Sequence, residues 1–303
     1  MKYLNLTPNF DPLHSNLRGK IEFEEFTFKG GEPHIKLDMG SIPHRYLADS
    51  AEEVTITQRI GSFNDMGLLE VAVDALKRIN PNIKLHLFLP YFPGARQDRL
   101  MVQGEPFTSA VYVKLLVNMG FASVTSFDLH SDVVSGMFAM TNTQFKQIPN
   151  YRFVLEVLKD LYPQRDAKLP LLISPDAGSN KKILSLAKYL TQLNKLDIVK
   201  CDKTRDVRTG EITNFDVYTD DLNGKDCIIV DDICDGGGTF LGLAKELKNK
   251  NCGKLYLVVS HGIFSKDING LLKVFDKIYT TDSVDVFKYQ QGIIPTDLKI
   301  IKL

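Results

Sequence analysis

Short apolar runs alternate along the chain with longer segments in which apolar residues recur every three or four positions. The short runs lack regular polar alternation and so predict strands buried on both faces, whereas the longer segments predict amphipathic helices. We expect strands at residues 54–57, 84–90, 123–127, 171–173, 196–201, 227–230 and 255–259, and helices at residues 65–79, 109–119, 181–193 and 239–248. This order predicts an α/β protein whose parallel sheets are covered by helices on both sides.

The pattern divides the chain into two similar halves. In each half a buried strand leads directly into acidic residues, Asp128 in the first and Asp231-Asp232 in the second. Pro149-Asn150 lies near a plausible linker. A chain of 303 residues is long enough for two domains, each with its own core.

Composition excludes some classes of partner. Hydrophobic residues make up 44% and charged residues 24% of the chain, as in soluble globular proteins. The 37 Lys and Arg residues balance the 37 Asp and Glu residues, so we expect neither nucleic acid nor a membrane as a partner. No apolar stretch reaches the roughly 20 residues that cross a bilayer, and the amino terminus shows no secretory pattern. The four cysteines lack CxxC spacing, which favours reduced, mostly buried thiols in a cytoplasmic protein.

The most informative segment runs from Cys227 to Thr239. It contains a buried strand, the carboxylates of Asp231 and Asp232, a glycine run and a threonine that opens a helix. Glycines let backbone N–H groups approach a ligand closely, and a helix start adds free donors and the positive end of its dipole. These features predict a site for a phosphate monoester, with the two aspartates accepting hydrogen bonds from sugar hydroxyls. The alternative is a plain glycine-rich turn, and the segment fits neither the Walker A nor the dinucleotide-binding pattern.

This segment resembles the phosphoribosyl-binding motif of type I phosphoribosyltransferases and ribose-phosphate pyrophosphokinases. The resemblance implies that Asp231 and Asp232 bind the ribose of ribose 5-phosphate, and that its phosphate is bound by Asp235, Gly236, Gly237, Gly238 and Thr239. Gly236 stands where the family usually has threonine, so one side-chain hydroxyl is lost while the backbone donors remain.

A second segment favours the pyrophosphokinases over the transferases. Residues Pro90 to Arg99 resemble the family's Pro-Tyr-Ala-Arg-Gln-Asp segment, which contacts ATP. The implied ATP-binding residues are Arg96, Gln97, Asp98 and Arg99. Taken alone, the same residues are equally well an exposed basic loop.

Two more segments resemble those that serve magnesium in the family. Asp128-Leu129-His130 resembles the Asp-Leu-His segment, and Ser174-Pro175-Asp176-Ala177-Gly178 the Ser-Pro-Asp-x-Gly segment. The resemblance implies Mg²⁺ as cofactor, near His130 and Asp176. Without it, a lone histidine after a strand is more often structural, because Mg²⁺ usually prefers oxygen ligands.

Lys203-Thr204-Arg205 falls where the pyrophosphokinases carry a Lys-x-Arg pair on a mobile catalytic loop. The resemblance implies that Lys203 and Arg205 are catalytic. Two cations would stabilise the negative charge that builds up during diphosphoryl transfer. A solvated charged turn over residues 202–211 is the plainer alternative.

Phe28-Lys29-Gly30-Gly31-Glu32 resembles the family's Phe-Ser-Asp-Gly-Glu segment, which reaches the adenine pocket of a neighbouring subunit. The resemblance implies ATP contacts from Phe28 and Glu32, and a homo-oligomer based on dimers, usually a hexamer in this family. Gly30 replaces the usual Asp or Asn.

Together, these matches imply two tandem type I phosphoribosyltransferase-like domains, each a mostly parallel sheet flanked by helices. The implied domains are residues 1–144 on the ATP side and 145–285 on the ribose 5-phosphate side, with a tail of about 286–303 able to pack on the first. The implied reaction moves the β,γ-diphosphate of ATP to the anomeric hydroxyl of ribose 5-phosphate, giving phosphoribosyl pyrophosphate and AMP.

Three other functions stay open: a non-catalytic relative of the enzyme, a phosphoribosyltransferase, and a nucleotide-sensing binding protein. Retention of Lys203, Arg205, His130 and Asp176 argues against the first. A transferase gives no reason for the segment from Arg96 to Arg99.

Several departures from the family affect finer contacts. Ser179 and Lys182 replace a usual glycine and arginine. Residues 100–107 contain Gly104 and lack the basic residues of many relatives. We therefore expect altered or absent allosteric control.

Overall fold

A computed structural model describes residues 2–7, 9–10, 19–47, 52–164, 168–191, 196–205, 212–288 and 295–303. The chain divides into two compact units: Met1–Pro149 with Lys302–Leu303, and Asn150–Ile301. Among the described residues, no helix is both long and apolar enough to cross a membrane. All four cysteines carry free thiols, and Cys252 alone among them is not fully buried.

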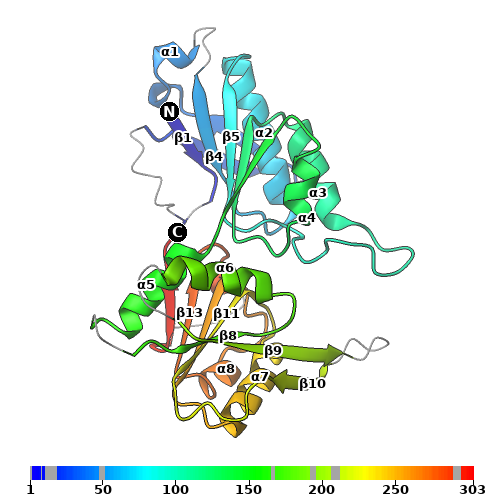
Figure 1. The fold of residues 1–303 in the computed structure, drawn as a ribbon. Coiled ribbons are helices and arrows are strands. Elements are labelled where there is room, and N and C mark those ends of the chain that lie inside the picture. The colour runs from blue at the N-terminus through cyan, green and yellow to red at the C-terminus, as the bar shows by residue number, and fades with distance from the viewer. Residues whose placement is uncertain are drawn as a thin grey trace. The chain divides into compact units, whose positions relative to one another are not determined.

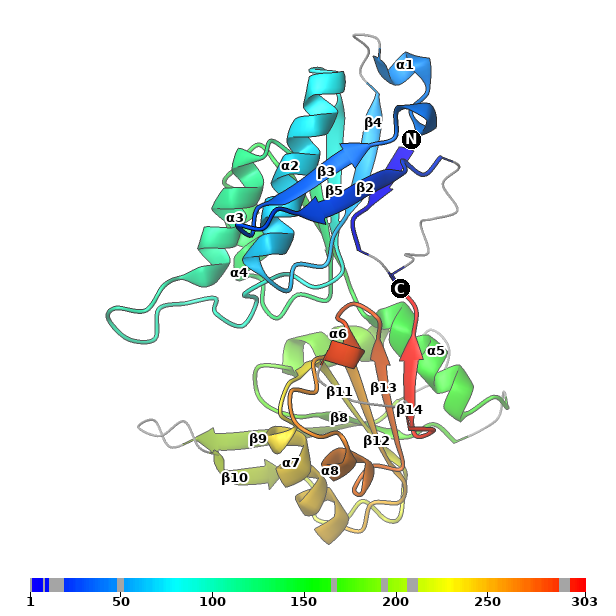
Figure 2. The ribbon, with the colours of Figure 1, turned by 180° about the vertical axis from the view of Figure 1, so that it is seen from behind.

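The first unit contains a five-stranded parallel sheet in the order β1-β4-β5-β6-β7 (Figure 1). Its strands are β1 (Lys2–Asn5), β4 (Glu53–Thr57), β5 (Lys84–Leu89), β6 (Ser123–Phe127) and β7 (Gln144–Ile148). Its helices are α1 (His44–Leu47), α2 (Phe63–Ile79), α3 (Thr108–Asn118) and α4 (Val133–Phe138), with a 3-10 turn at Met39–Ser41. A separate hairpin of β2 (Phe23–Thr27) and β3 (Pro33–Leu37) packs against α2 (Figure 2).

The two faces of this first sheet differ in how deeply their side chains are buried. One face packs on the core with α2 and carries Val54, Ile56, Leu85, Leu87 and Val124. On the opposite face Thr55, His86 and Ser123 align across three strands and keep part of their surface exposed. Here His86 Nδ1 lies 2.7 Å from Ser123 Oγ. The alternation is present in the sequence itself, because Glu53-Val54-Thr55-Ile56-Thr57 places polar residues at every second position.

The second unit contains a seven-stranded sheet in the order β10-β9-β8-β11-β12-β13-β14. All neighbouring strands are parallel except β9 and β10. The strands are β8 (Leu171–Ser174), β9 (Ile198–Arg205), β10 (Ile212–Val217), β11 (Cys227–Cys234), β12 (Leu255–Gly262), β13 (Lys277–Thr281) and β14 (Leu298–Ile301). The helices are α5 (Tyr151–Leu161), α6 (Asn180–Leu190), α7 (Gly238–Asn249) and α8 (Asn269–Leu272), with a 3-10 turn at Val286–Lys288.

Both faces of the second sheet are covered, as the sequence predicted. Every side chain of β8 and β12 is buried. Helix α7 packs Phe240, Leu243 and Leu247 into the core on one face, and α5 and α6 cover the other (Figures 1 and 2). The α/β class is confirmed.

The C-terminal tail contributes to both units. Strand β14 pairs with β13, with Leu298 opposite Ile278, so residues 298–301 form an edge strand of the second sheet, whereas Lys302–Leu303 belong to the first unit. Asp160 on α5 holds this edge: it pairs with Lys299 and Lys277 and accepts a hydrogen bond from the Tyr279 hydroxyl at 2.7 Å. Strand β7 reaches Ile148, which moves the division between the units from residue 144 to Pro149.

Candidate functional site

The phosphate loop connects β11 to α7, as predicted, but β11 is longer than expected. The strand continues through Asp231 and Asp232 to Cys234 and pairs with β12 over this length, ending with Cys234 opposite Gly262. On its other side, the pairing with β8 stops at Ile229. Asp231 and Asp232 therefore lie on a strand that is held by β12 on one side. On the other side they extend beyond the last residue that pairs with β8.

The loop conformation requires glycine at position 237. Gly237 is the residue that precedes α7 and has a φ of 77°, in the left-handed region that other residues adopt at a cost. A Cβ atom there would also lie 3.1 Å from both methyl groups of Leu271. The first turn of α7 has no side-chain cap from Gly237, so its backbone N–H groups are donors of the kind that bind phosphate.

The adjacent acidic side chains strongly affect each other. Asp232 is buried, with 6% exposure, and its backbone N–H donates to Asp231 Oδ1 at 2.9 Å. Burial raises the pKa of Asp231 well above its ordinary value, and the negative charge of Asp232 raises it further. Asp231 keeps some exposed surface towards the pocket, but the protein around its carboxyl removes most of the water. A ligand that donates hydrogen bonds, such as a vicinal diol, would relieve this repulsion.

A third carboxylate, Asp176, comes from the turn after β8. Its Oδ1 accepts a hydrogen bond from the Ser179 N–H at 2.9 Å. The Ser179 hydroxyl donates to the Asp176 carbonyl at 2.7 Å and lies 2.8 Å from the Ser174 hydroxyl. Ser179, which departs from the family's glycine, therefore stabilises the turn that orients Asp176.

Lys203 lies beside Asp176, but on a strand. It belongs to β9, opposite Phe215 of β10, so the expectation of a loop after residue 201 is wrong for Lys203 and Thr204. Its ammonium group forms an ion pair with Asp176 Oδ2. Burial alone would raise the pKa of Asp176, but this ion pair outweighs burial and the pKa is lowered.

Other parts of the predicted catalytic segment are less completely described. Arg205 is the last residue of β9, and its side chain lies outside the described residues, as do residues 206–211 of the expected loop. Strand β10 was missed in the sequence. The polar and apolar alternation Ile212-Thr213-Asn214-Phe215-Asp216-Val217 was the available signal.

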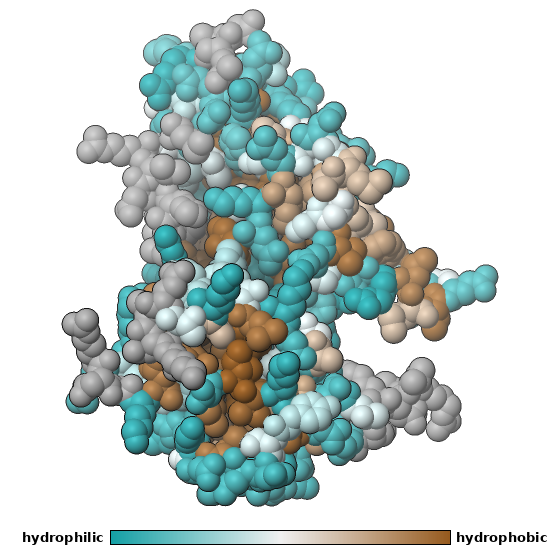
Figure 3. Space-filling view, in the orientation of Figure 1, coloured by the Kyte–Doolittle hydropathy of each residue, from teal (hydrophilic) through white to brown (hydrophobic). Residues whose placement is uncertain are grey.

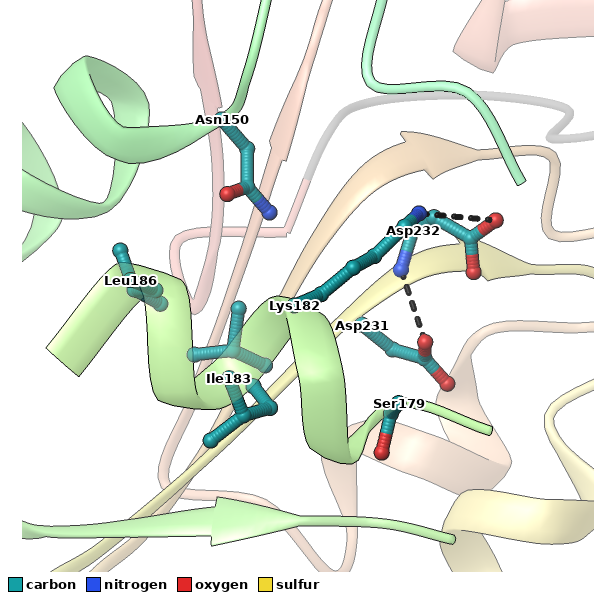
Figure 4. Close-up of a pocket in the computed structure, with 8 residues that line it drawn as sticks. Asn150, Ser179, Lys182, Ile183, Leu186, Asp231 and Asp232 are labelled. Carbon is teal, nitrogen blue, oxygen red and sulfur yellow. Dashed lines mark hydrogen bonds and ion pairs between the residues drawn. The ribbon is translucent and has the colours of Figure 1, made fainter. Parts of the chain in front are cut away.

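A small pocket lies beside the acidic pair of β11 (Figure 4). Ser179, Lys182 and Ile183 contribute from the start of α6, and Asp231 and Asp232 from β11. Lys182 points from α6 towards the acidic pair, and its Nζ lies 3.8 Å from Asp232 Oδ2. Lys182 replaces the family's arginine and was not among the predicted site residues.

In the first unit, the predicted ATP segment follows β5 and is held to α3. The Ser109 hydroxyl at the start of α3 donates to the carbonyls of Gly94 and Gln97 at 2.7 and 3.0 Å. Arg96 and Gln97 are exposed, while Asp98 is buried at 4% exposure.

Asp98 and Arg99 form a bidentate pair. The Arg99 guanidinium donates to both Asp98 oxygens at 2.8 and 3.1 Å and lowers the pKa of that carboxyl. His130 and Ser131, from the loop after β6, act on the same carboxylate in the same direction. Asp98 thus orients Arg99, and this segment lies close to His130.

The remaining predicted residues are elsewhere in the first unit. Phe28 and Glu32 lie on the turn of the β2-β3 hairpin, where the Phe28 N–H donates to the Glu32 carbonyl at 2.9 Å. Phe28 is 52% exposed and packs edge-on against Phe26, with ring centroids 4.9 Å apart. The two predicted magnesium ligands, His130 and Asp176, belong to different units. Within the described ranges, no group of three or more His, Cys, Asp or Glu side chains is arranged to hold a metal ion.

The loop at residues 100–107 carries apolar side chains where many relatives have basic ones. Leu100, Met101 and Val102 are 63%, 74% and 60% exposed. Figure 3 shows these apolar side chains on the loop that projects from the first unit.

A twisted parallel sheet with paired acids on its central strand and a glycine loop opening a helix defines the phosphoribosyltransferase class of α/β protein. The chain matches the phosphoribosyl transferase domain family over residues 142–295. It is 31% identical over 224 residues to a ribose-phosphate pyrophosphokinase of Vibrio cholerae, covering 73% of this chain and 67% of that one. It is also 31% identical over 252 residues to that of Mycoplasmopsis pulmonis, covering 82% and 74%.

A solved structure shares the fold over nearly the whole chain. It is the phosphoribosylpyrophosphate synthetase of Mycobacterium smegmatis, with a TM-score of 0.77, 20% identity, and coverage of 99% of this chain and 93% of that one. The chain belongs to the ribose-phosphate pyrophosphokinase family.

Proposed function

We propose that the protein is a ribose-phosphate diphosphokinase, which transfers the β,γ-diphosphate of ATP to ribose 5-phosphate and releases AMP. The observation that carries this proposal is the meeting of Lys203, Asp176 and the acidic pair beside one phosphate loop. A phosphoribosyltransferase would use the loop and the acids, but it gives no role to the Arg96-Gln97 segment.

The second unit would bind ribose 5-phosphate. Backbone N–H groups of Asp235 to Thr239 bind the 5-phosphate at the positive end of α7. Asp231 and Asp232 accept hydrogen bonds from the ribose hydroxyls and fix the anomeric carbon. Because both acids lie on a paired strand, little conformational entropy is lost when the sugar binds.

The transfer step needs cations near the diphosphate. The anomeric oxygen forms a bond to the β-phosphorus, the bond from that phosphorus to the α-phosphate oxygen breaks, and AMP leaves while the hydroxyl proton is released. Lys203 would leave its ion pair with Asp176 to stabilise the charge on the transferring oxygens, with Arg205 beside it. Positioning and charge stabilisation supply the catalysis, with no covalent enzyme intermediate.

ATP would be bound by the first unit. Arg96 and Arg99 offer planar guanidinium groups to the phosphates, with Gln97 between them and Asp98 holding Arg99 in place. Phe28 and Glu32 would contact the adenine of ATP bound to a neighbouring subunit, which makes the active protein a homo-oligomer. About half of the Phe28 surface (52%) is exposed in its own unit, which leaves the ring accessible to a base.

The donor set fits Mg²⁺ that is held mainly by substrate oxygens. Asp176 offers the hard carboxylate oxygens that Mg²⁺ prefers, and His130 lies next to the Asp98-Arg99 pair. The described side chains do not form a complete cage, which agrees with a cation that arrives with ATP. When bound, Mg²⁺ would neutralise charge on the phosphates.

The test is AMP formation from ATP, with Mg²⁺, in the presence and absence of ribose 5-phosphate. We expect ribose-dependent AMP release that falls at least 100-fold in Lys203→Ala, the size of loss seen when a transition-state donor is removed. Lys200→Ala, an exposed lysine on the same strand, should retain activity. A folded wild-type protein that binds ATP but releases no ribose-dependent AMP would show a non-catalytic relative instead.

A further inference from the structure

A lysine lies over the one phosphate-loop position that departs from the family. Gly236 replaces the usual threonine, and a Cβ atom built on it would lie 3.3 Å from both Cδ and Cε of Lys266. The Lys266 ammonium is one bond of about 1.5 Å beyond Cε. The lysine stem thus occupies the space beside Gly236, and its charged end lies close to the phosphate loop.

Hydrogen bonds fix the segment that carries Lys266 to this loop. The N–H groups of Ile263 and Phe264 both donate to the Cys234 carbonyl, at 2.9 and 3.1 Å. The Ser265 hydroxyl donates to Asp235 Oδ1. Lys266 therefore follows three consecutive residues that are anchored to the end of β11 or to the loop itself, so the backbone fixes the point beside the loop from which its side chain extends.

Several carboxylates lie near the phosphate loop, so a cation beside the loop would favour the binding of a phosphate. Asp176, Asp231 and Asp232 lie close enough to act on one another's pKa values, and Asp235 is on the loop that is proposed to bind a phosphate dianion. The two other lysines described near the pocket face carboxylates: Lys203 pairs with Asp176, and Lys182 lies 3.8 Å from Asp232. The Lys266 side chain lies against Gly236 of the phosphate loop and is exposed to solvent.

We propose that Lys266 binds the 5-phosphate of ribose 5-phosphate and replaces the threonine hydroxyl that is absent at Gly236. This inference rests on the proposed function. The two positions are coupled sterically, because a threonine at 236 would press on the Lys266 stem. The charge-assisted hydrogen bond from the Lys266 ammonium group to the phosphate replaces the neutral hydrogen bond of the threonine hydroxyl.

The test measures direct binding of ribose 5-phosphate by calorimetry, together with steady-state kinetics, in the full-length protein. Lys266→Met keeps most of the stem and removes the charge. We expect affinity for ribose 5-phosphate to fall roughly five- to tenfold and its KM to rise by the same factor, as for loss of one partly exposed charged contact. The kcat and the KM for ATP should change less than twofold. Lys245→Met, an exposed lysine further along α7, is the matched control and should bind like the wild type.

A second pair of variants tests the coupling. Gly236→Thr should weaken binding in the wild-type background, where Lys266 fills the space. In a Lys266→Ala background the same substitution should strengthen binding, because the hydroxyl then has room to reach the phosphate. Unchanged affinity in Lys266→Met, or no gain from Gly236→Thr in the Lys266→Ala background, would overturn the inference.

Failure of this inference can be told apart from failure of the proposed function. A wild-type protein that binds ribose 5-phosphate but releases no AMP contradicts the proposed function, and the binding comparison still decides the role of Lys266. A protein that releases AMP but loses no affinity in Lys266→Met contradicts the inference alone.

Discussion

Replacing Asp231 with asparagine should make the empty protein more stable and its sugar site weaker. Burial raises the pKa of Asp231, and the negative charge of Asp232 next to it raises that pKa further. Asparagine is nearly the same size, carries no charge, and can still accept the Asp232 N–H, which lies 2.9 Å from Asp231 Oδ1. Asp231→Asn therefore removes the unfavourable charge while keeping the local hydrogen bond.

The size of the gain depends on pH. In the unfolded chain an aspartate releases its proton near pH 3.9, whereas the folded Asp231 holds its proton to a higher pH. Between those two pKa values the native state binds more protons, so the wild-type free energy of unfolding falls by about 1.4 kcal/mol for each pH unit. Asparagine has no such proton. The advantage of Asp231→Asn should thus be small near pH 4 and grow by about 1.4 kcal/mol per unit until the folded carboxyl ionises.

Urea unfolding at several pH values between 4 and 8 measures this difference, with Asp220→Asn, an exposed carboxylate, as the control. The same variant should raise the KM for ribose 5-phosphate about tenfold, because hydrogen bonds to a charged group contribute about 1.5–3 kcal/mol. A difference in unfolding free energy that does not change with pH, or a destabilised variant at pH 7, would refute the assigned environment of Asp231.

Three further predictions follow from other parts of the chain. Phe28→Ala should raise the KM for ATP about tenfold, since stacking on a base contributes about 1–3 kcal/mol; Met39→Ala, equally exposed, is the control, and an unchanged KM would remove Phe28 from the ATP site. Asp160→Ala should lower the free energy of urea unfolding by about 1–3 kcal/mol, because the buried Tyr279 hydroxyl loses its acceptor. Hydrogen bonding to Lys299 lowers the pKa of Asp160. The stabilising effect of Asp160 should therefore be complete above about pH 4 and disappear as the pH falls below about 4. Equal stability of the wild type and Asp160→Ala at pH 7 would contradict this prediction. ADP should inhibit only in competition with ATP, because the loop at residues 100–107 lacks the family's basic residues; inhibition through a separate site would contradict this.

Much of the second unit could be predicted from the sequence, because its signals are local. The buried strand, the paired acids and the glycine run lie within one short segment, and a helix start follows directly. Asp176 and Lys203 were predicted to share a site, and the structure brings them into contact. Their contact arises from strand order, since β9 lies next to β8, and pairing between strands leaves little trace in either segment alone.

Other features depend on partners that are distant in the chain. The extension of β9 through charged residues is explained by its pairing with β10, which satisfies the backbone whatever the side chains are. The place of β14 likewise depends on its pairing with β13 and on the Asp160 contacts, which the tail segment alone does not reveal. Lys266 gave no signal, and Lys182 was noticed only as a replacement of the family's arginine, because a single lysine becomes informative only when its neighbours in space are known.

The difference between the two sheets implies different tolerance of mutation in the two halves of one chain. In the first sheet, Thr55, His86 and Ser123 align across β4 to β6 and keep part of their surface exposed, so selection there can accept other polar residues. Along β8 and β12, every position is enclosed, so a larger residue, or a polar residue without a hydrogen-bond partner, would disturb packing. Over evolutionary time the exposed positions of the first sheet can therefore diverge, while β8 and β12, beside the proposed ribose site, change slowly.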